Sequence, residues 1–315
     1  MNFFAAILCF ALLSLCPLTG AALSFPLPEN WNDVVGEIKT VTARYEDTFS
    51  DIGRAHDLGY NEMVDANPGV DPWLPGEGTE IILPTRFILP PGPREGIVIN
   101  LAELRLYYYP PGENRIVTHP LGIGREGWST PTGQARDKGK KQDPSWRPPE
   151  SIRREHADEG RPLPAVVEAG PENPLGQHAI YLSMTGYLLH GTNKPYGVGM
   201  RVSHGCIRLY PEDISSLFAQ VPVNTPVRII NEPYKVGWQN GKLFIEAHKP
   251  LTEQQIEHGH DFTPLIRKVV TSLGLSTLQP DWETVKSAAE SQRGYPVPIA
   301  VAGSATTQDQ TDSLW

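Results

Sequence analysis

Proline and glycine interrupt this chain so often that long helices cannot dominate its fold. The 315 residues include 31 prolines and 29 glycines, and both residue types concentrate in turns. Between the interruptions, β-branched and aromatic residues alternate with polar ones, most clearly over residues 97–124. The tyrosines at 107–109 are then expected to face core and surface in turn. The sequence predicts a mainly β protein with α+β elements, of about two domains by its length.

A small unit is predicted at residues 38–86. The alternating TVTARY indicates a strand, DTFSDIGRAH and GYNEMVDAN indicate two short helices, and TEIILP indicates a closing strand. The Asp that opens the first helical stretch can cap it. The proline-rich residues 88–96 are predicted to form a semi-rigid spacer. A second domain is therefore expected to follow, over residues 94–231.

The alternation fails between residues 125 and 176, where proline, glycine and charged residues are dense. A loop of this length inside a compact domain is either disordered or a functional lid. Trp128, Trp146 and the helix-like IRREHADE favour a folded flap. Trp146 could contact a substrate or anchor the flap to the rest of the domain.

The C-terminal part, residues 232–295, begins with a hairpin signal. Asn240-Gly241 between two apolar runs is typical of a two-residue turn, and this hairpin is expected to extend the main sheet. Two amphipathic helices are predicted next, packed on the second domain. The polar end, residues 296–315, is predicted to be a disordered tail.

Residues 1–22 have the features of a cleaved secretory leader. An apolar run from Phe3 to Leu18 precedes the small residues that a leader peptidase accepts. The run of about 16 residues is shorter than the roughly 20 that a membrane-spanning helix needs. Cleavage near Ala21 or Ala22, and hence export, is predicted.

Export would leave a single cysteine in the mature chain. Of Cys9, Cys16 and Cys206, the first two lie in the predicted leader. A lone thiol in an oxidising compartment offers no disulfide, so a chemical role explains it better than a structural one. Cys206 is flanked by His204 and Arg208, which can assist a thiol nucleophile.

A second histidine can reach the same thiol. His190, in LLHGTN, lies 16 positions upstream of Cys206, at the end of a predicted strand. That separation is long enough to bring two strand ends together. Either His190 or His204 could therefore act on the thiol, and His190 is the preferred base.

The stretches HGTN and RVSHGCIRL, with STPTG and GPENPLG upstream, resemble the signature of the YkuD-type L,D-transpeptidases. Residues 66–84, ANPGVDPWLPGEGTEIILP, resemble the end of a LysM carbohydrate-binding module. The resemblance spans about residues 40–230 and is closest to exported enzymes that attach an outer-membrane lipoprotein to peptidoglycan. It implies a β-sandwich-like catalytic domain with a cysteine nucleophile, a periplasmic location and no cofactor. The LysM-like unit could bind glycan or serve only in packing.

The resemblance also implies roles for individual residues. His190 would be the base for Cys206, and the Gly191 carbonyl would orient its imidazole. The N–H groups of Gly205 and Cys206 would form an oxyanion hole. His204 would shape the site or transfer a proton, and these two roles stay open.

Four further residues are expected to bind substrate. Arg208 stands where many relatives carry Asn and would suit a substrate carboxylate. The other three are Ser203, Thr192 and Trp146. The nearby histidines at 258 and 260 are expected to be exposed, so no metal site is predicted.

The predicted reaction is an acyl transfer on peptidoglycan. Cys206 would attack the amide carbonyl at the L-centre of diaminopimelate in a tetrapeptide stem and release D-alanine. The thioester would pass to an amine of a lipoprotein lysine, a diaminopimelate or a D-amino acid, and the flap would exclude water. An L,D-carboxypeptidase and a non-catalytic peptidoglycan-binding protein are the alternatives. A net charge of −9 argues against nucleic acid as a partner.

Overall fold

The computed structural model describes residues 22–29, 32–258 and 261–301. Residues 1–21 of the predicted leader, most of the predicted tail and His260 lie outside these ranges, and the exposure of His258 is not described either. Within them, none of the helices is long and apolar enough to cross a membrane. The predicted fold class, mainly β with α+β elements, is confirmed.

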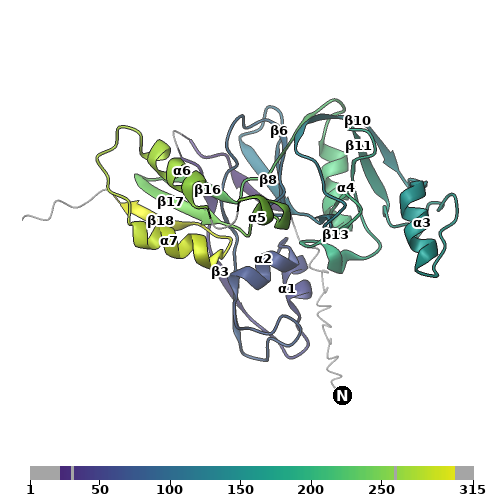
Figure 1. The fold of residues 1–315 in the computed structure, drawn as a ribbon, viewed down its shortest axis with the longest axis horizontal. Coiled ribbons are helices and arrows are strands. Elements are labelled where there is room, and N and C mark those ends of the chain that lie inside the picture. Colours follow the sequence, from purple (N-terminus) through teal and green to yellow (C-terminus); the bar gives the residue numbers. More distant parts are fainter. Residues whose placement is uncertain (1–21, 30–31, 259–260, 302–315) are drawn as a thin grey trace, which may run out of the picture.

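A nine-stranded sheet forms the centre of the molecule (Figure 1). Most of its neighbouring strands are antiparallel, but β6–β15 and β12–β14 are parallel. In spatial order its strands are β1 (Leu23–Pro26), β8 (Arg115–Pro120), β7 (Arg105–Tyr109), β6 (Gly96–Asn100), β15 (Pro226–Ile230), β10 (Gly133–Gln142), β11 (His178–Leu182), β12 (Leu188–His190) and β14 (Ile207–Arg208). Helix α4 (Pro211–Gln220) packs against β11. A separate parallel pair joins β9 (Ile123–Gly124) to β13 (Arg201–Ser203).

Both faces of strand β7 are covered, which corrects the expectation for its tyrosines. Tyr107, Tyr108 and Tyr109 are at most 5% exposed. Tyr108 belongs to the core beneath α4, whereas Tyr107 and Tyr109 pack with Phe49 and Leu58 of the N-terminal unit. The prediction of a half-exposed strand was wrong because a separate part of the chain covers the second face.

The N-terminal unit has the predicted order of strand, helix, helix and strand. These elements are β3 (Lys39–Thr42), α1 (Phe49–Ala55), α2 (Tyr60–Ala66) and β4 (Glu80–Leu83), with β3 and β4 antiparallel. Thr48 caps α1 by accepting the Asp51 N–H, so the Asp suggested by the sequence is not the cap. Asn67 of the Asn-Pro-Gly turn pairs through its amide with the backbone of Ile82. A second short pair, β2 (Val34–Gly36) with β5 (Arg86–Ile88), leads to the main sheet.

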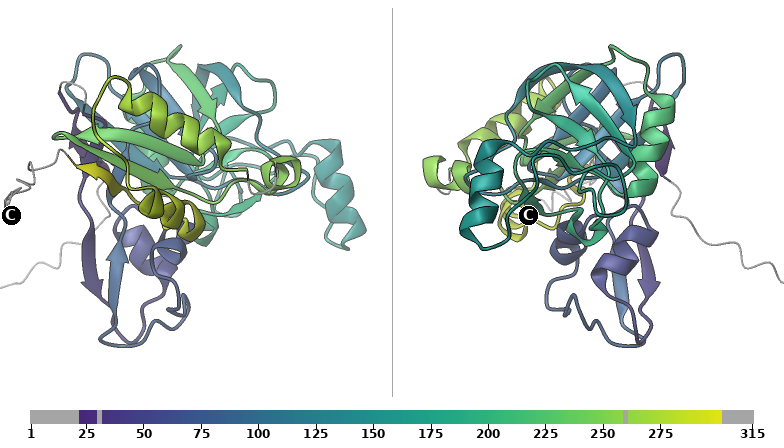
Figure 2. Two further views of the ribbon diagram at one scale, coloured as in Figure 1. Left: turned by 60° about the vertical axis from the view of Figure 1, so that its left-hand side comes forward. Right: turned by 90° about the vertical axis from the view of Figure 1, so that its right-hand side faces the viewer.

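The predicted flap contains both a strand and a helix. The helix-like segment is α3 (Glu150–Asp158), which stands at the periphery of the molecule (Figures 1 and 2). Strand β10 was missed, because only Ala135 and Asp137 of its ten residues are buried. With so few apolar positions, alternation of hydrophobic residues could not reveal it. The predicted flap therefore divides into a short loop at residues 125–132 and a longer excursion at residues 143–177, one on each side of β10.

The C-terminal part builds its own sheet. Strands β16 (Tyr234–Gln239) and β17 (Lys242–Ala247) are joined at Asn240-Gly241, whose φ angles of 50° and 73° fit the expected turn. Strand β18 (Val297–Val301) completes a three-stranded sheet instead of belonging to a tail. Helices α6 (Thr263–Leu273) and α7 (Trp282–Ser291) pack on this sheet. The hairpin thus does not extend the main sheet. Helices α6 and α7 pack against the C-terminal sheet and not, as predicted, on the second domain.

A buried ionic network joins this C-terminal sheet to the main one. Lys235 on β16 is 1% exposed and lies 2.8 Å from a carboxylate oxygen of both Glu103 and Glu246. Its ammonium also donates to the Ile88 carbonyl. Glu246 also lies 2.6 Å from His248 Nε2, so Lys235 and His248 together face the two buried carboxylates that join the sheets.

Candidate active site

Parallel pairing of two short strands brings the predicted nucleophile and base into one place. Strand β12 ends at His190, and β14 begins directly after Cys206. In the β12–β14 pair, His190 lies opposite Arg208. All three side chains line one cavity of about 510 Å³. The other lining residues include Ser145, Trp146, Ile152, Leu175, Tyr181, Leu188, Ser203 and His204.

The His190 imidazole is held as a neutral base. Its Nδ1 lies 2.6 Å from the Gly191 carbonyl oxygen, which can only accept, so Nδ1 carries the proton and Nε2 keeps a free lone pair. Burial and the charge of Arg208 lower the pKa of His190 to about 3. The ring is therefore unprotonated near neutral pH and able to accept a proton.

The Cys206 side chain is poised as a thiol in the free enzyme. Its sulfur donates to the Gly186 carbonyl oxygen at 3.6 Å. Burial raises the pKa of the thiol, while a hydrogen bond from the Leu188 N–H and the charge of Arg208 oppose the rise. Because the thiol and the imidazole are both neutral and share one cavity, the proton is expected to leave the sulfur only as it attacks.

The Ser203 side chain stabilises the turn that carries Cys206. Its hydroxyl donates to the Cys206 carbonyl at 2.6 Å and accepts the Gly205 N–H at 3.2 Å. Gly205 has a φ of 102°, a conformation that favours glycine. The Gly205 N–H is thus already engaged, which leaves the Cys206 N–H as the freer donor of the predicted oxyanion hole.

His204 lies in the same cavity but is bonded to the flap. Its Nε2 is 2.9 Å from Glu155 on α3 and 3.2 Å from the Arg125 guanidinium. Arg125 also pairs with Glu155, and the Trp128 ring meets the imidazole edge-on. These contacts indicate that His204 holds the flap in place. The geometry therefore favours His190 as the base.

The remaining predicted residues differ in position. Arg208 lines the cavity, and its Nε is buried without a hydrogen-bond partner among the described residues. Trp146 lines the cavity, and its backbone pairs with that of Val167, a contact within the flap that does not attach the flap to the sheet. Thr192 is buried, and its hydroxyl accepts the Lys194 N–H at 2.9 Å. Since Thr192 is not among the lining residues, its contact with substrate stays a prediction without geometric support.

Sequence reasoning missed Glu155 and Arg125. Both lie in the stretch identified as a flap, and Glu155 is part of the helix-like segment. Their meeting at His204 depends on how the flap returns to the sheet, which no local pattern encodes.

Comparison with known proteins agrees with this geometry. A family model described as the L,D-transpeptidase catalytic domain, YkuD, matches residues 94–229. The Escherichia coli (strain K12) protein Probable L,D-transpeptidase YcfS is 42% identical over 296 residues, covering 92% of each chain. Probable L,D-transpeptidase ErfK/SrfK of Salmonella typhimurium (strain LT2) is 40% identical over 289 residues, covering 89% of this chain and 92% of its own.

The likeness to a solved structure is weaker. The NMR structure of the catalytic domain from E. faecium L,D-transpeptidase covers 43% of this chain and 96% of its own, at 22% identity and a TM-score of 0.34. The assignment to a family rests on the relatives that match over most of their length. With about 40% identity over most of its length, the chain belongs to the L,D-transpeptidase family.

Proposed function

We propose that this L,D-transpeptidase acts on peptidoglycan tetrapeptide stems through a thioester on Cys206. The observation that carries the proposal is the His190 imidazole, buried and bonded through Nδ1 to Gly191, in the same cavity as Cys206. A base held in this tautomer can take the thiol proton without a preformed ion pair.

The first half-reaction follows from these protonation states. The Cys206 sulfur attacks the amide carbonyl at the L-centre of diaminopimelate while Nε2 of His190 takes the thiol proton. The Cys206 N–H is the nearest backbone donor for the developing oxyanion. The intermediate collapses to a thioester, and the proton on His190 passes to the amine of the leaving D-alanine.

The second half-reaction reverses these roles. An amine attacks the thioester, His190 takes its extra proton, and the thiol is restored. The thioester keeps the energy of the cleaved amide, so no nucleotide is needed. A lipoprotein lysine is the proposed acceptor, with a diaminopimelate amine as the second candidate.

Arg208 is the proposed anchor for a carboxylate of the stem. Arg208 lines the cavity, and its buried Nε has no partner among the described residues. A bound carboxylate would satisfy that donor and offset the cost of burying the charge.

The N-terminal unit is proposed to hold the enzyme on glycan. Tyr45 is 79% exposed and Trp73 is 56% exposed, and the Trp73 ring lies tilted against that of Tyr60 with a distance of 5.7 Å between their centroids. Exposed aromatic rings offer apolar faces to sugars. Removal of the leader and a periplasmic location belong to the same proposal, because the substrate lies outside the inner membrane.

Carbapenem acylation tests the proposed nucleophile. Intact-protein mass spectrometry should show one adduct on the enzyme and none on Cys206→Ala. An adduct that persists in the variant would rule out Cys206. A carboxypeptidase would acylate too, so the products from tetrapeptide muropeptides, with and without an amine, separate transfer from hydrolysis.

A further inference from the structure

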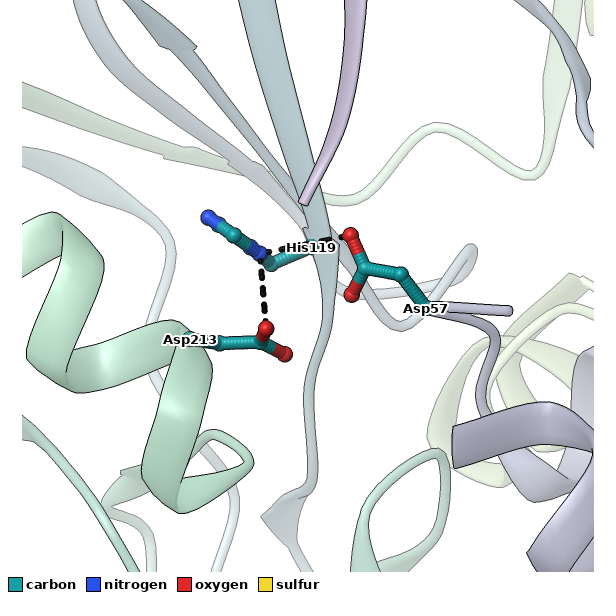
Figure 3. Close-up of side chains that lie close together, drawn as sticks. All are labelled: Asp57, His119 and Asp213. Carbon is teal, nitrogen blue, oxygen red and sulfur yellow. Dashed lines mark ion pairs between the residues drawn. The ribbon is translucent and has the colours of Figure 1, made fainter. Parts of the chain in front are cut away.

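Away from the active site, three buried side chains form a charged cluster where the N-terminal unit meets the main sheet. Asp57 follows α1, His119 lies on β8 and Asp213 lies in the first turn of α4. The His119 Nδ1 is 3.4 Å from Asp57 and 3.3 Å from Asp213 (Figure 3). All three are at most 3% exposed.

This cluster offers one ionisable base to two carboxyl groups. Burial opposes protonation of His119, but the two carboxylates raise its pKa to about 10, so the imidazolium is the one cation that faces them. Burial and the charge of Asp57 raise the pKa of Asp213, as expected where carboxylates are incompletely balanced. Among the described residues, Asp57 Oδ1 and Asp213 Oδ2 have no hydrogen-bond partner.

Neighbouring charges do not fill the deficit, because they are paired with each other. Arg105 forms an ion pair with Glu62 at 2.7 Å, and Arg54 forms one with Glu212 at 2.8 Å. A buried net charge of this kind is costly unless a further cation reaches it.

The start of strand β1 supplies a nitrogen at the required place. The Leu23 backbone N lies 2.8 Å from Asp57 Oδ2, and β1 runs along the edge of β8, the strand that carries His119. Leu23 directly follows the predicted leader. Gly20 and Ala22 provide the small residues that a leader peptidase accepts at the third and first positions before the cut.

We propose that the cluster is a binding site for the α-ammonium group that leader removal creates on Leu23. Water hydrolyses the Ala22–Leu23 amide: the leader leaves with the Ala22 carboxylate, and Leu23 gains an amine that takes up a proton. The new ammonium donates to Asp57 and supplies a second cation for the two carboxyl groups. The N-terminal strand is then locked onto the sheet only in the processed protein.

A divalent cation is the rival occupant of this cluster. A histidine that ligates a metal ordinarily donates its other ring N–H to a second partner. His119 Nε2 is buried and has no partner among the described residues. The second partner that a metal-bound histidine ordinarily has is therefore missing here, which counts against a metal at this site.

Two chains that differ by one residue test the proposal. Both are released from a cleavable fusion that leaves no extra residues, one beginning at Leu23 and the other at Ala22. Urea unfolding should show a folding constant about ten- to hundredfold larger for the Leu23 chain, the range of a charge-assisted hydrogen bond. The difference should fall below about twofold when both chains carry Asp57→Asn. Equal stabilities with Asp57, or a difference that survives the substitution, would overturn the proposal.

Two measurements need no variant of the cluster. The α-amine of the folded Leu23 chain should react with acetic anhydride at least about tenfold more slowly than that of the Ala22 chain, because it is buried and ion-paired; equal rates would refute the site. N-terminal sequencing of the full chain after export from a bacterial host should begin at Leu23, and another N-terminus would contradict the proposal. Stoichiometric divalent metal in the purified Leu23 chain would assign the cluster to a cation. These tests depend on leader removal and not on the transpeptidase chemistry, so either proposal can fail alone.

Discussion

The neutral state of His190 leads to a quantitative prediction for the pH dependence of acylation. An ordinary histidine, with a pKa of about 6.5, is about nine-tenths neutral at pH 7.5 and about one-tenth neutral at pH 5.5. An enzyme that relied on such a base would lose about tenfold in rate over this interval. His190, with its pKa lowered to about 3 by burial and by Arg208, stays neutral throughout. The acylation rate of Cys206 should therefore change by less than about twofold.

Single-turnover acylation by a carbapenem, followed by loss of β-lactam absorbance, measures this rate directly. Folding must be checked at each pH, because a depressed histidine pKa costs stability in acid. The unfolded chain takes up a proton near pH 6.5 while folded His190 does not, so stability present above pH 6.5 falls as the pH drops towards 3. The loss is about 1.4 kcal/mol at pH 5.5.

The variant Arg208→Gln tests the cause of the low pKa. Without the guanidinium charge the pKa of His190 should rise, and the acid limb of the profile should move to higher pH. A wild-type rate that falls tenfold with a midpoint near pH 6.5 would refute the neutral-base account. An unchanged acid limb in Arg208→Gln would refute the role of the Arg208 charge.

Three further predictions concern the fold, the flap and the N-terminal unit. Lys235→Met should lower the free energy of unfolding by about 3–5 kcal/mol, because two buried carboxylates lose their cation; a loss below about 1 kcal/mol in urea unfolding would contradict that reading. Glu155→Gln should weaken the bond between the flap and His204 and so raise the ratio of hydrolysed to transferred product, as measured by mass spectrometry. Glu150→Gln, on the exposed side of the same helix, should leave this ratio unchanged. Equal ratios in the two variants would show that the flap bond does not exclude water. Trp73→Ala should reduce binding to purified peptidoglycan sacculi without changing carbapenem acylation, and unchanged co-sedimentation would argue that the N-terminal unit serves only in packing.

Local chemistry explains which parts of this fold could be predicted. The turn at Asn240-Gly241 was predictable because its two residues favour positive φ angles. The presence of Cys206 and His190 in one cavity was predictable because each lies in a short stretch that resembles the family signature. In each case the signal lies within a few residues.

Contacts between distant segments explain the rest. The buried tyrosines of β7 depend on a unit about 50 residues upstream in sequence, which covers their second face. Most residues of strand β10 are charged or polar, and only two of its ten residues are buried. Its pairing with β15 therefore could not be predicted from hydrophobic alternation. The contact of His204 with Glu155 likewise joins segments that are far apart in the sequence. The same is true of the pairing of β18 with β17. Each of these errors came from tertiary contacts overriding a local pattern.

The central claim is that Cys206 transfers an acyl group from a tetrapeptide stem to an amine. Mass spectrometry of the products from a purified disaccharide-tetrapeptide and an amine acceptor tests it most directly. The account predicts a conjugate lighter than donor plus acceptor by one D-alanine, formed by the enzyme and absent with Cys206→Ala. A tripeptide product that forms regardless of the amine, or a conjugate that the Cys206→Ala variant still makes, would contradict it.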